Sequence, residues 1–179
     1  MNSLLSLSRL RIAERNWRMN ERIISDGLLL AFDTSSSVGS VAVGREGAVL
    51  AHAELEQQRK HASALIPIIR AVLSEADVDK SELDGIVVGE GPGSFTGVRV
   101  AAATAKGMVH ALGLPLWAVS SLAATALSVE GHGIRYVLFD ARSDRVYGAC
   151  YGVGKMGMET LVFPHAGTLR EVLAGEIPA

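Results

Sequence analysis

The sequence contains few of the residues that mark disulfide-rich, membrane-spanning or nucleic-acid-binding proteins. Among 179 residues there is one cysteine, Cys150, which cannot form an internal disulfide or a thiolate metal cluster. No apolar run approaches the roughly 18 residues that a membrane-spanning helix needs. The formal net charge is -2, so there is no excess of positive charge to grip nucleic acid. We therefore expect a cytoplasmic protein without membrane association or strong direct nucleic-acid binding.

The sequence also lacks the usual signatures of a catalytic or metal centre. No two of its histidines stand at the spacing of a zinc-binding pair. No G-x-S-x-G elbow is present, and no Cys-His pattern accompanies Cys150. These absences predict that the chain has no catalytic residue and no metal site.

The composition is that of an ordinary globular protein, with 49% hydrophobic and 20% charged residues. Residues 1–27 differ from the rest, because they carry five arginines, few acids and no long apolar core. This excludes a secretory signal. We interpret residues 1–27 as a disordered extension or the result of a start assigned too early, with an organellar targeting segment as the alternative.

The order of apolar patterns predicts an α/β fold. A continuous apolar run over 28–33 indicates a buried strand, and alternating residues around a glycine turn at 44–47 indicate a hairpin beside it. Helical spacing and short apolar runs then alternate. They predict a helix over 61–76, a strand over 84–90, a helix over 96–112, a strand over 114–120 and a helix over 121–130.

An internal repeat divides the chain near residue 131. "RYVLFDARSDRVYGACY" and "LLLAFDTSSSVGSVAV" are both apolar strands that end in Phe-Asp, followed by a polar turn and an alternating strand. Asp33 and Asp140 occupy matching places. We interpret this as two βββαβα units, the second cut short. The predicted organisation is a first lobe over 28–130 and a partial second lobe over 131–179.

A glycine-rich segment between a strand and a helix is the first candidate site. Free backbone N–H groups at such a place attract phosphate, and the candidates are Gly91, Gly93, Ser94, Thr96 and Gly97. The segment lacks the Gly-Lys-Ser/Thr ending of a P-loop and the G-x-G-x-x-G spacing of a dinucleotide fold. A tight turn with Ser94 or Thr96 as the helix cap is the equal alternative.

The second candidate site is the polar turn after the first strand. Asp33, Thr34 and Ser35 could hold a hydrated Mg²⁺ and a nucleotide phosphate. The alternative is a hydrogen-bonded turn that only starts the hairpin. The residue pattern leaves both interpretations open.

The two helices of the first lobe form the third candidate site. Small residues at spacing four, Ala101 with Ala105 and Ala103 with Gly107, allow another helix to approach closely. The helix that begins at His61 is apolar on more than one side. The two helices therefore either cover the sheet alone or also form an interface with a partner chain.

Four stretches together resemble one protein family, the TsaB family, also called YeaZ. They are "LLLAFDTSSSVGSVAV", "KHASALIPIIRAVL", "GIVVGEGPGSFTGVRVAAATAKGMVHALGLPLWAVSSLAAT" and "FDARSDRVYGACY". "GPGSFTGVR" is a specific signature, and the similarity extends over most of 28–151. The resemblance implies an actin-like, Hsp70-like ATPase fold (ribonuclease H-like) with duplicated halves.

The resemblance implies a non-catalytic role beside TsaD, the subunit that makes threonylcarbamoyladenosine (t6A) at position 37 of certain tRNAs. It implies docking to TsaD through the two helices, recruitment of the ATPase TsaE by the complex, and homodimer formation when TsaD is missing. No cofactor is then required by this chain, and ATP or ADP with Mg²⁺ acts in the complex. The interface candidates carried over are His61, Leu65, Ile69, Val72, Val100, Ala103 and Gly107.

Two enzymatic alternatives remain beside this interpretation. A free-standing actin-fold ATPase or kinase would need Asp33 as a magnesium-site acid and a complete second lobe. A glycoprotease-like peptidase follows from an older label of the family, but the chain offers no nucleophile for it. TsaD-type proteins carry a metal-binding histidine pair on their first helix region, where this chain shows only His61. We expect the 91–97 loop to serve mainly to position the helix that follows it, and hence the interface.

Overall fold

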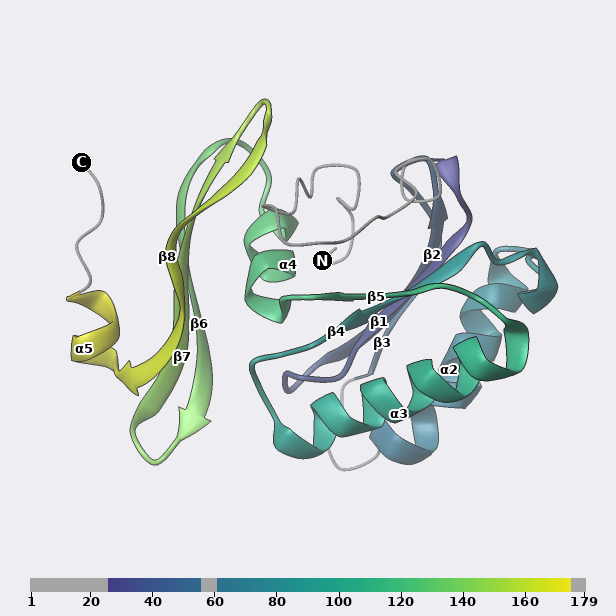
Figure 1. Ribbon diagram of the computed structural model, residues 1–179, viewed down its shortest axis with the longest axis horizontal. Coiled ribbons are helices and arrows are strands. Elements are labelled where there is room, and N and C mark those ends of the chain that lie inside the picture. Colours follow the sequence, from purple (N-terminus) through teal and green to yellow (C-terminus); the bar gives the residue numbers. More distant parts are fainter. Residues whose placement is uncertain (1–25, 56–60, 175–179) are drawn as a thin grey trace.

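The computed structural model describes residues 26–55 and 61–174. Figure 1 shows two β-sheets side by side, with helix α4 between them, helices α2 and α3 on one side of the larger sheet, and α5 at the far side of the smaller sheet. Of residues 1–27, only Asp26 and Gly27 fall within the described part, so the interpretation of that segment stays a prediction. None of the helices in the described ranges is long and apolar enough to cross a membrane.

The larger sheet has five strands in the order β3-β2-β1-β4-β5. β1 (Leu29–Asp33), β2 (Gly39–Arg45) and β3 (Ala48–Leu55) form an antiparallel meander. β4 (Gly85–Gly89) and β5 (Leu116–Val119) continue the sheet in parallel with β1. The predicted buried strand, hairpin and two later strands are therefore confirmed.

Two helices cover one face of this sheet. α2 (His61–Glu75) packs on β2 and β3, while α3 (Phe95–Leu112) packs on β4 and β1. A short 3-10 turn, η3 (Lys80–Glu82), lies between α2 and β4. Alternate residues of β1, such as Leu30 and Phe32, point into the core under these helices and are fully buried. Each such side chain contributes about 1.5–3 kcal/mol, so burial of this face fixes both helices.

The smaller sheet has three antiparallel strands in the order β6-β7-β8. They are β6 (Gly133–Arg142), β7 (Arg145–Gly154) and β8 (Gly157–Thr168). α4 (Ser121–Ser128) packs on one face, where it shares a core with residues of β6 and β7. α5 (Leu169–Leu173) packs on the opposite face against β7 and β8.

The internal repeat is confirmed in the topology. In both units three consecutive antiparallel strands are followed by a helix that packs on the second and third of them. α4 differs from the expectation, because its apolar residues pack on the second sheet although the sequence places it in the first lobe. The truncation of the second unit stays a prediction.

Candidate functional site: two interlocked loops and a helical face

The two predicted phosphate-loop candidates lie next to each other. β1 and β4 are parallel neighbours, with Phe32 opposite Val88 in register. Because parallel strands end at the same sheet edge, the turn after Asp33 and the turn after Gly89 emerge side by side. The sequence-predicted residues of both loops are thus brought together.

The Asp33 carboxylate joins three segments of the chain. Its Oδ1 accepts a hydrogen bond from the Ser35 N–H at 2.7 Å, and its Oδ2 accepts one from the Ser121 hydroxyl at 2.5 Å. The same Ser121 oxygen accepts the Gly91 N–H at 3.1 Å. Ser121 opens α4 and is 2% exposed. The carboxylate and the hydroxyl therefore fix the two loops and α4 to one another.

The glycines near this junction make room for neighbouring chain. A Cβ on Gly89 would lie 2.1 Å from Asp33 Oδ2, and one on Gly93 would lie 2.3 Å from the Ser35 carbonyl oxygen. A Cβ on Gly97 would lie 1.8 Å from the carbonyl oxygen of Thr34. All three distances are far below any tolerable contact, so these positions require glycine. The space that the glycines leave is filled by the first loop itself.

Hydrogen bonds across the two loops complete the junction. The fully buried Thr34 hydroxyl donates to the Gly97 carbonyl oxygen at 2.6 Å, and the Ser94 N–H donates to the Ser35 carbonyl oxygen at 2.6 Å. The Ser94 hydroxyl accepts the Gly97 N–H at 3.3 Å and caps α3. Thr96 is exposed and takes no part in the cap. Of the two predicted caps, Ser94 is the correct one.

Two observations bear on metal or phosphate binding at the junction. Within the described residues, no three histidine, cysteine, aspartate or glutamate side chains gather as metal ligands. A magnesium ion at Asp33 would thus take its remaining ligands from water or nucleotide. The Ser35 hydroxyl is buried without a hydrogen-bond partner among the described residues. Nucleotide binding by Asp33, Thr34 and Ser35 stays a prediction.

Gly89, Ser120 before α4 and Ser121 at the first position of α4 were not identified from the sequence. Ser120 caps α4, since its hydroxyl accepts the Ala123 N–H at 3.4 Å. It also hydrogen-bonds the buried Tyr151 side chain of β7; burial raises the pKa of Tyr151, and this bond partly opposes the shift. The pattern Ser-Ser before an apolar helix is a cap signal that could have identified Ser120. No pattern identifies Ser121, because its partners lie far away in the sequence.

The structure separates the predicted interface residues into two sets. Leu65, Ile69 and Val72 are at most 3% exposed and belong to the core between α2 and the sheet. The family resemblance named these three residues as interface candidates, and their burial against the sheet corrects that assignment. Val100 is half-buried against the same core. The side chain of His61, the first residue of α2, lies outside the described part.

The exposed set lies mainly on α3. Ala103 and Gly107 are exposed, and a Cβ on Gly107 would meet nothing within 4 Å. The other small pair, Ala101 and Ala105, is fully buried against the sheet. The Ala101/Ala105 pair therefore lets α3 pack closely on its own sheet, and the Ala103/Gly107 pair forms a smooth outward surface.

Larger exposed side chains surround this surface. Phe95 is 69% exposed at the start of α3, and the Arg99 guanidinium lies 3.6 Å from the centre of its ring. Ile66 is 40% exposed on α2. α2 and α3 contact each other and cover the same face of the sheet, and these residues are exposed on the two helices. We call this surface the α2/α3 face and define it by Ile66, Arg70, Phe95, Arg99, Ala103, Lys106 and Gly107.

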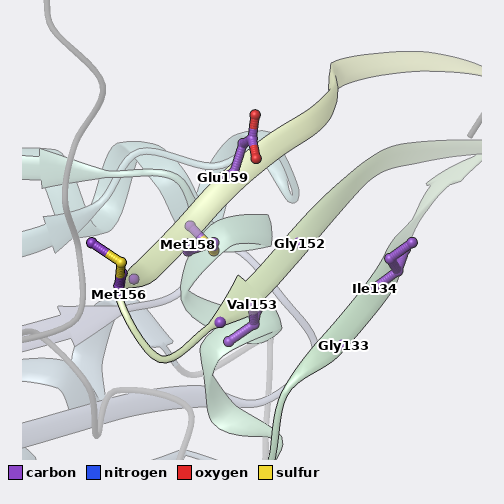
Figure 2. A pocket seen from close by; sticks show the side chains of 9 residues that line it. Gly133, Ile134, Gly152, Val153, Met156, Met158 and Glu159 are labelled. Atoms are coloured by element: carbon purple, nitrogen blue, oxygen red, sulfur yellow. The ribbon is translucent and has the colours of Figure 1, made fainter. Parts of the chain in front are cut away.

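A separate hollow of about 490 Å³ lies on the smaller sheet. Figure 2 shows that its labelled residues come from β6, β7, β8 and the turn that carries Met156. Among the described residues that line it, Glu159 alone is ionisable. One exposed carboxylate among glycines and apolar side chains does not form a catalytic constellation.

The chain is similar to proteins of one family in sequence and in structure. A family model, TsaD: tRNA N6-adenosine threonylcarbamoyltransferase, matches residues 48–175. The Bacillus subtilis protein TsaB, a tRNA threonylcarbamoyladenosine biosynthesis protein, is 36% identical over 126 residues, which are 69% of this chain and 54% of that protein. TsaB of Escherichia coli shows the same identity and the same coverage. The chain thus spans about half the length of these relatives.

Solved structures agree with the sequence matches. YeaZ from Pseudomonas aeruginosa superposes with a TM-score of 0.72 at 38% identity, over 78% of this chain and 67% of that one. The chain belongs to the TsaB (YeaZ) family. The chain, with its two sheets, therefore has the actin-like ATPase fold. A second Pseudomonas structure, with a TM-score of 0.73 and 37% identity over 79% of this chain and 67% of that one, is described as similar to peptidase YeaZ.

Proposed function

We propose that this chain acts in t6A biosynthesis as a non-catalytic subunit that binds a TsaD-type threonylcarbamoyltransferase. The TsaB relatives are t6A biosynthesis proteins by name, and the TsaD family model matches most of the chain. In this proposal the chain itself needs no cofactor. ATP, Mg²⁺ and a TsaE-type ATPase act at the level of the cytoplasmic complex.

The observation that carries the proposal is the α2/α3 face. It combines exposed apolar groups, Ile66 and Phe95, with a smooth stretch at Ala103 and Gly107. Large exposed side chains around small residues allow a partner helix to approach closely and to bury aromatic surface. The inward side of both helices is already used by the core, so the outward side is the part available to a partner.

The interlocked loops support the non-catalytic part of the proposal. The Asp33 carboxylate, the Thr34 hydroxyl and the α3 cap all bond to other parts of the chain. Groups that hold segments of the chain together in this way already have a structural role, which favours a positioning role for the two loops. We infer that the glycine loop serves to position α3, and through it the α2/α3 face.

Size-exclusion chromatography with light scattering tests this proposal. The purified chain is mixed with a TsaD-type protein from the same source, and the mass of the eluted species is measured. We expect a stable mixed complex that is weakened at least about 100-fold by Ala103→Arg, because the long side chain blocks close approach. Ala48→Arg, on an exposed alanine of β3, is the matched control and should leave the complex intact.

Two results would contradict the proposal. One is the absence of any mixed complex while the chain remains folded by circular dichroism. The other is a complex that Ala103→Arg and Ala48→Arg affect equally. Turnover of ATP by the isolated chain, abolished by Asp33→Asn, would instead support the ATPase alternative. Hydrolysis of a peptide substrate by the isolated chain would support the peptidase alternative.

A further inference from the structure

The two outer strands of the smaller sheet differ in how well their edges are protected against a further strand. β8 contains Pro164, which has no N–H to offer, and its ladder with β7 is interrupted by two register shifts. β6 contains no proline, and its ladder with β7 runs without interruption from Gly133 to Asp140. The outer edge of β6 is therefore the regular and unprotected edge of this sheet.

The internal repeat indicates that a strand can be added at this edge. β6 corresponds to β1, because Asp33 and Asp140 occupy matching places. β1 pairs with β2 on one side and with β4 on the other. Within the described residues, β7 is the one strand that pairs with β6. The side of β6 opposite to β7 is thus the place where a further strand would add.

Exposed apolar side chains follow this edge on one face of the sheet. Ile134 is 56% exposed and Leu138 is 39% exposed. Because side chains alternate along a strand, both lie on the same face as Tyr136 between them. This face carries α5, since the side chains of Leu138 and of Val172 in α5 both lie beside Gly148. Figure 2 shows Ile134 at the β6 side of the hollow on the smaller sheet.

The charged residue within this stretch, Arg135, does not protect the edge. Its guanidinium donates hydrogen bonds to three backbone carbonyl oxygens at the end of α4, those of Ala126, Glu130 and Gly131. These bonds hold Arg135 on the α4 side of the sheet. A charged side chain protects a sheet edge where it would be buried by an added strand without a partner. Arg135 already has its partners.

A second copy of β6 is complementary to this edge in an antiparallel arrangement. A two-fold axis perpendicular to the sheet keeps each face on its own side, so it has to pass through a residue and not between two. With the axis at Tyr136, Ile134 of one copy lies opposite Leu138 of the other copy. The two exposed apolar residues thus cover each other. Tyr136 pairs with its own counterpart, and aromatic pairs across strands are favourable.

The remaining pairs of this register are also favourable. On the α4 side, Phe139 lies opposite Gly133 of the other copy, and an aromatic ring covers the backbone that an edge glycine leaves bare. At each end, Asp140 lies opposite His132, whose ring can donate a hydrogen bond to a carboxylate.

The neighbouring registers lack this complementarity. With the axis at Val137, the carboxylate of Asp140 lies opposite the apolar Ile134. With the axis at Leu138, the pairing extends into the irregular ladder between Asp140 and Arg142. The register centred on Tyr136 is therefore the one that the side chains favour.

We propose that the outer edge of β6 pairs with β6 of a second copy, antiparallel and centred on Tyr136. The two three-stranded sheets then form one continuous sheet of six strands. This homodimer uses a surface other than the α2/α3 face and does not rest on the proposed function. The α2/α3 face of each copy stays available to a different partner.

Sedimentation velocity of the full chain over a range of concentrations tests the pairing. We expect a dimer whose fraction rises with concentration. Ile134→Lys places a charge where the second copy would bury it, so self-association should weaken at least about 30-fold. Phe163→Lys, on a side chain of β8 that is 76% exposed, adds the same charge and should change it less than about threefold. Circular dichroism checks that both variants fold.

Cysteine cross-linking tests the register without a charge. Single variants Ile134→Cys and Leu138→Cys are mixed and oxidised with copper phenanthroline. Residues directly opposite in an antiparallel pair have Cβ atoms about 4.5–5.5 Å apart, so the mixture should give a disulfide-linked dimer. Each variant alone should give little, because its two cysteines lie four residues apart along the strands, roughly 13 Å. The wild-type chain, whose Cys150 is fully buried, is the control that should not cross-link.

Several results would overturn the inference. A wild-type chain that stays monomeric at every concentration would do so. A dimer that Ile134→Lys and Phe163→Lys weaken equally, or one that cross-links in the single variants and not in the mixture, would do so as well. A dimer that is lost in Ala103→Arg but kept in Ile134→Lys would place self-association on the α2/α3 face instead. The proposed function is measured separately, because Ile134→Lys should leave the mixed complex with the TsaD-type protein intact.

Discussion

At the scale of single residues, the junction of the two loops depends on glycines at positions where a Cβ would collide with neighbouring chain. Gly97 lies in the first turn of α3, and its missing Cβ leaves room for the Thr34 carbonyl oxygen. Gly107 lies in the same helix but faces open space. Substitution of alanine for glycine at these two positions therefore distinguishes two effects on stability. At Gly97 it tests the close packing, and at Gly107 it tests helix propensity alone.

Gly97→Ala should destabilise the protein by about 2–4 kcal/mol, because the new methyl group collides with backbone that cannot move independently. Gly107→Ala should stabilise it by about 0.5–1 kcal/mol, since alanine favours the helix and meets no atom. Urea unfolding followed by circular dichroism measures both values. Equal effects of the two substitutions would show that the close approach at Gly97 does not constrain the fold.

Ser121 offers a second prediction at the residue scale. Ser121→Ala leaves Asp33 Oδ2 and the Gly91 N–H without their shared partner. The cost should be about 1–3 kcal/mol, as for buried groups that lose a hydrogen bond. Ser128→Ala, which removes a hydroxyl bonded to the Thr125 carbonyl oxygen in the same helix, is the control. Thermal unfolding that ranks Ser128→Ala as the more damaging change would contradict this account.

At the scale of elements, α5 is short and depends on its N-terminal cap. The Thr168 hydroxyl accepts the Glu171 N–H at 3.3 Å, and the Glu171 carboxylate accepts the Thr168 N–H at 2.8 Å. One turn later, the fully buried Val172 contacts the smaller sheet at Gly148. The capping box thus positions the residue by which the helix is anchored.

The hydrogen bonds from the Thr168 backbone and side chain lower the pKa of Glu171 below its ordinary value of 4.5. A lowered pKa in the folded state means that the charged form contributes stability above the ordinary value and that this stability is lost as pH falls through the lowered one. We expect the methyl NMR signals of Val172 to shift in that acidic range. Glu171→Gln should abolish the shift, whereas Glu159→Gln, on exposed β8, should not. A Val172 titration that persists in Glu171→Gln would refute the cap mechanism.

Helix α2 and the two loops show most clearly how much of the structure could be predicted from the sequence. The bounds of α2 follow from local spacing, and so do the strands on either side of it. The side of α2 that faces the sheet does not follow, because apolar residues lie on several sides and tertiary contacts decide among them. Leu65 and Val72 were therefore named as interface candidates although both are fully buried. Likewise, the glycine loop was identified at once, but the loop that fills its space comes from residues about sixty positions earlier.

At the scale of the whole molecule, α4 connects the two sheets. Its first residue, Ser121, holds Asp33 at the end of the larger sheet. Its apolar residues, among them the fully buried Leu122, pack on Val137 and Ala149 of the smaller sheet. Because one helix contributes to both units, loss of either packing should weaken the other.

We therefore expect the two sheets to unfold in one transition. Trp117 in β5 is 6% exposed, so its fluorescence reports on the larger sheet. The measurement uses a Trp17→Phe variant, which removes the second tryptophan. Cys150 in β7 is fully buried, and burial raises the pKa of its thiol, so a thiolate-specific reagent should react only after unfolding. In the folded protein the thiol stays protonated below its ordinary pKa of 9.0, and it ionises only as pH rises through the higher pKa of the folded state. The labelling is therefore done near neutral pH. The urea midpoints for Trp117 fluorescence and Cys150 labelling should coincide.

Leu122→Ala tests the link that α4 provides between the sheets. Truncation of this buried side chain should cost about 2–5 kcal/mol and move both urea midpoints down together, because α4 holds both sheets. Leu173→Ala, on a side chain of α5 that is 47% exposed, should leave both nearly unchanged. If Cys150 becomes reactive in Leu122→Ala while Trp117 fluorescence stays native, the sheets are independent units. In that case the Asp33–Ser121 contact would be a local feature of the loops, and α4 would belong to the second sheet alone.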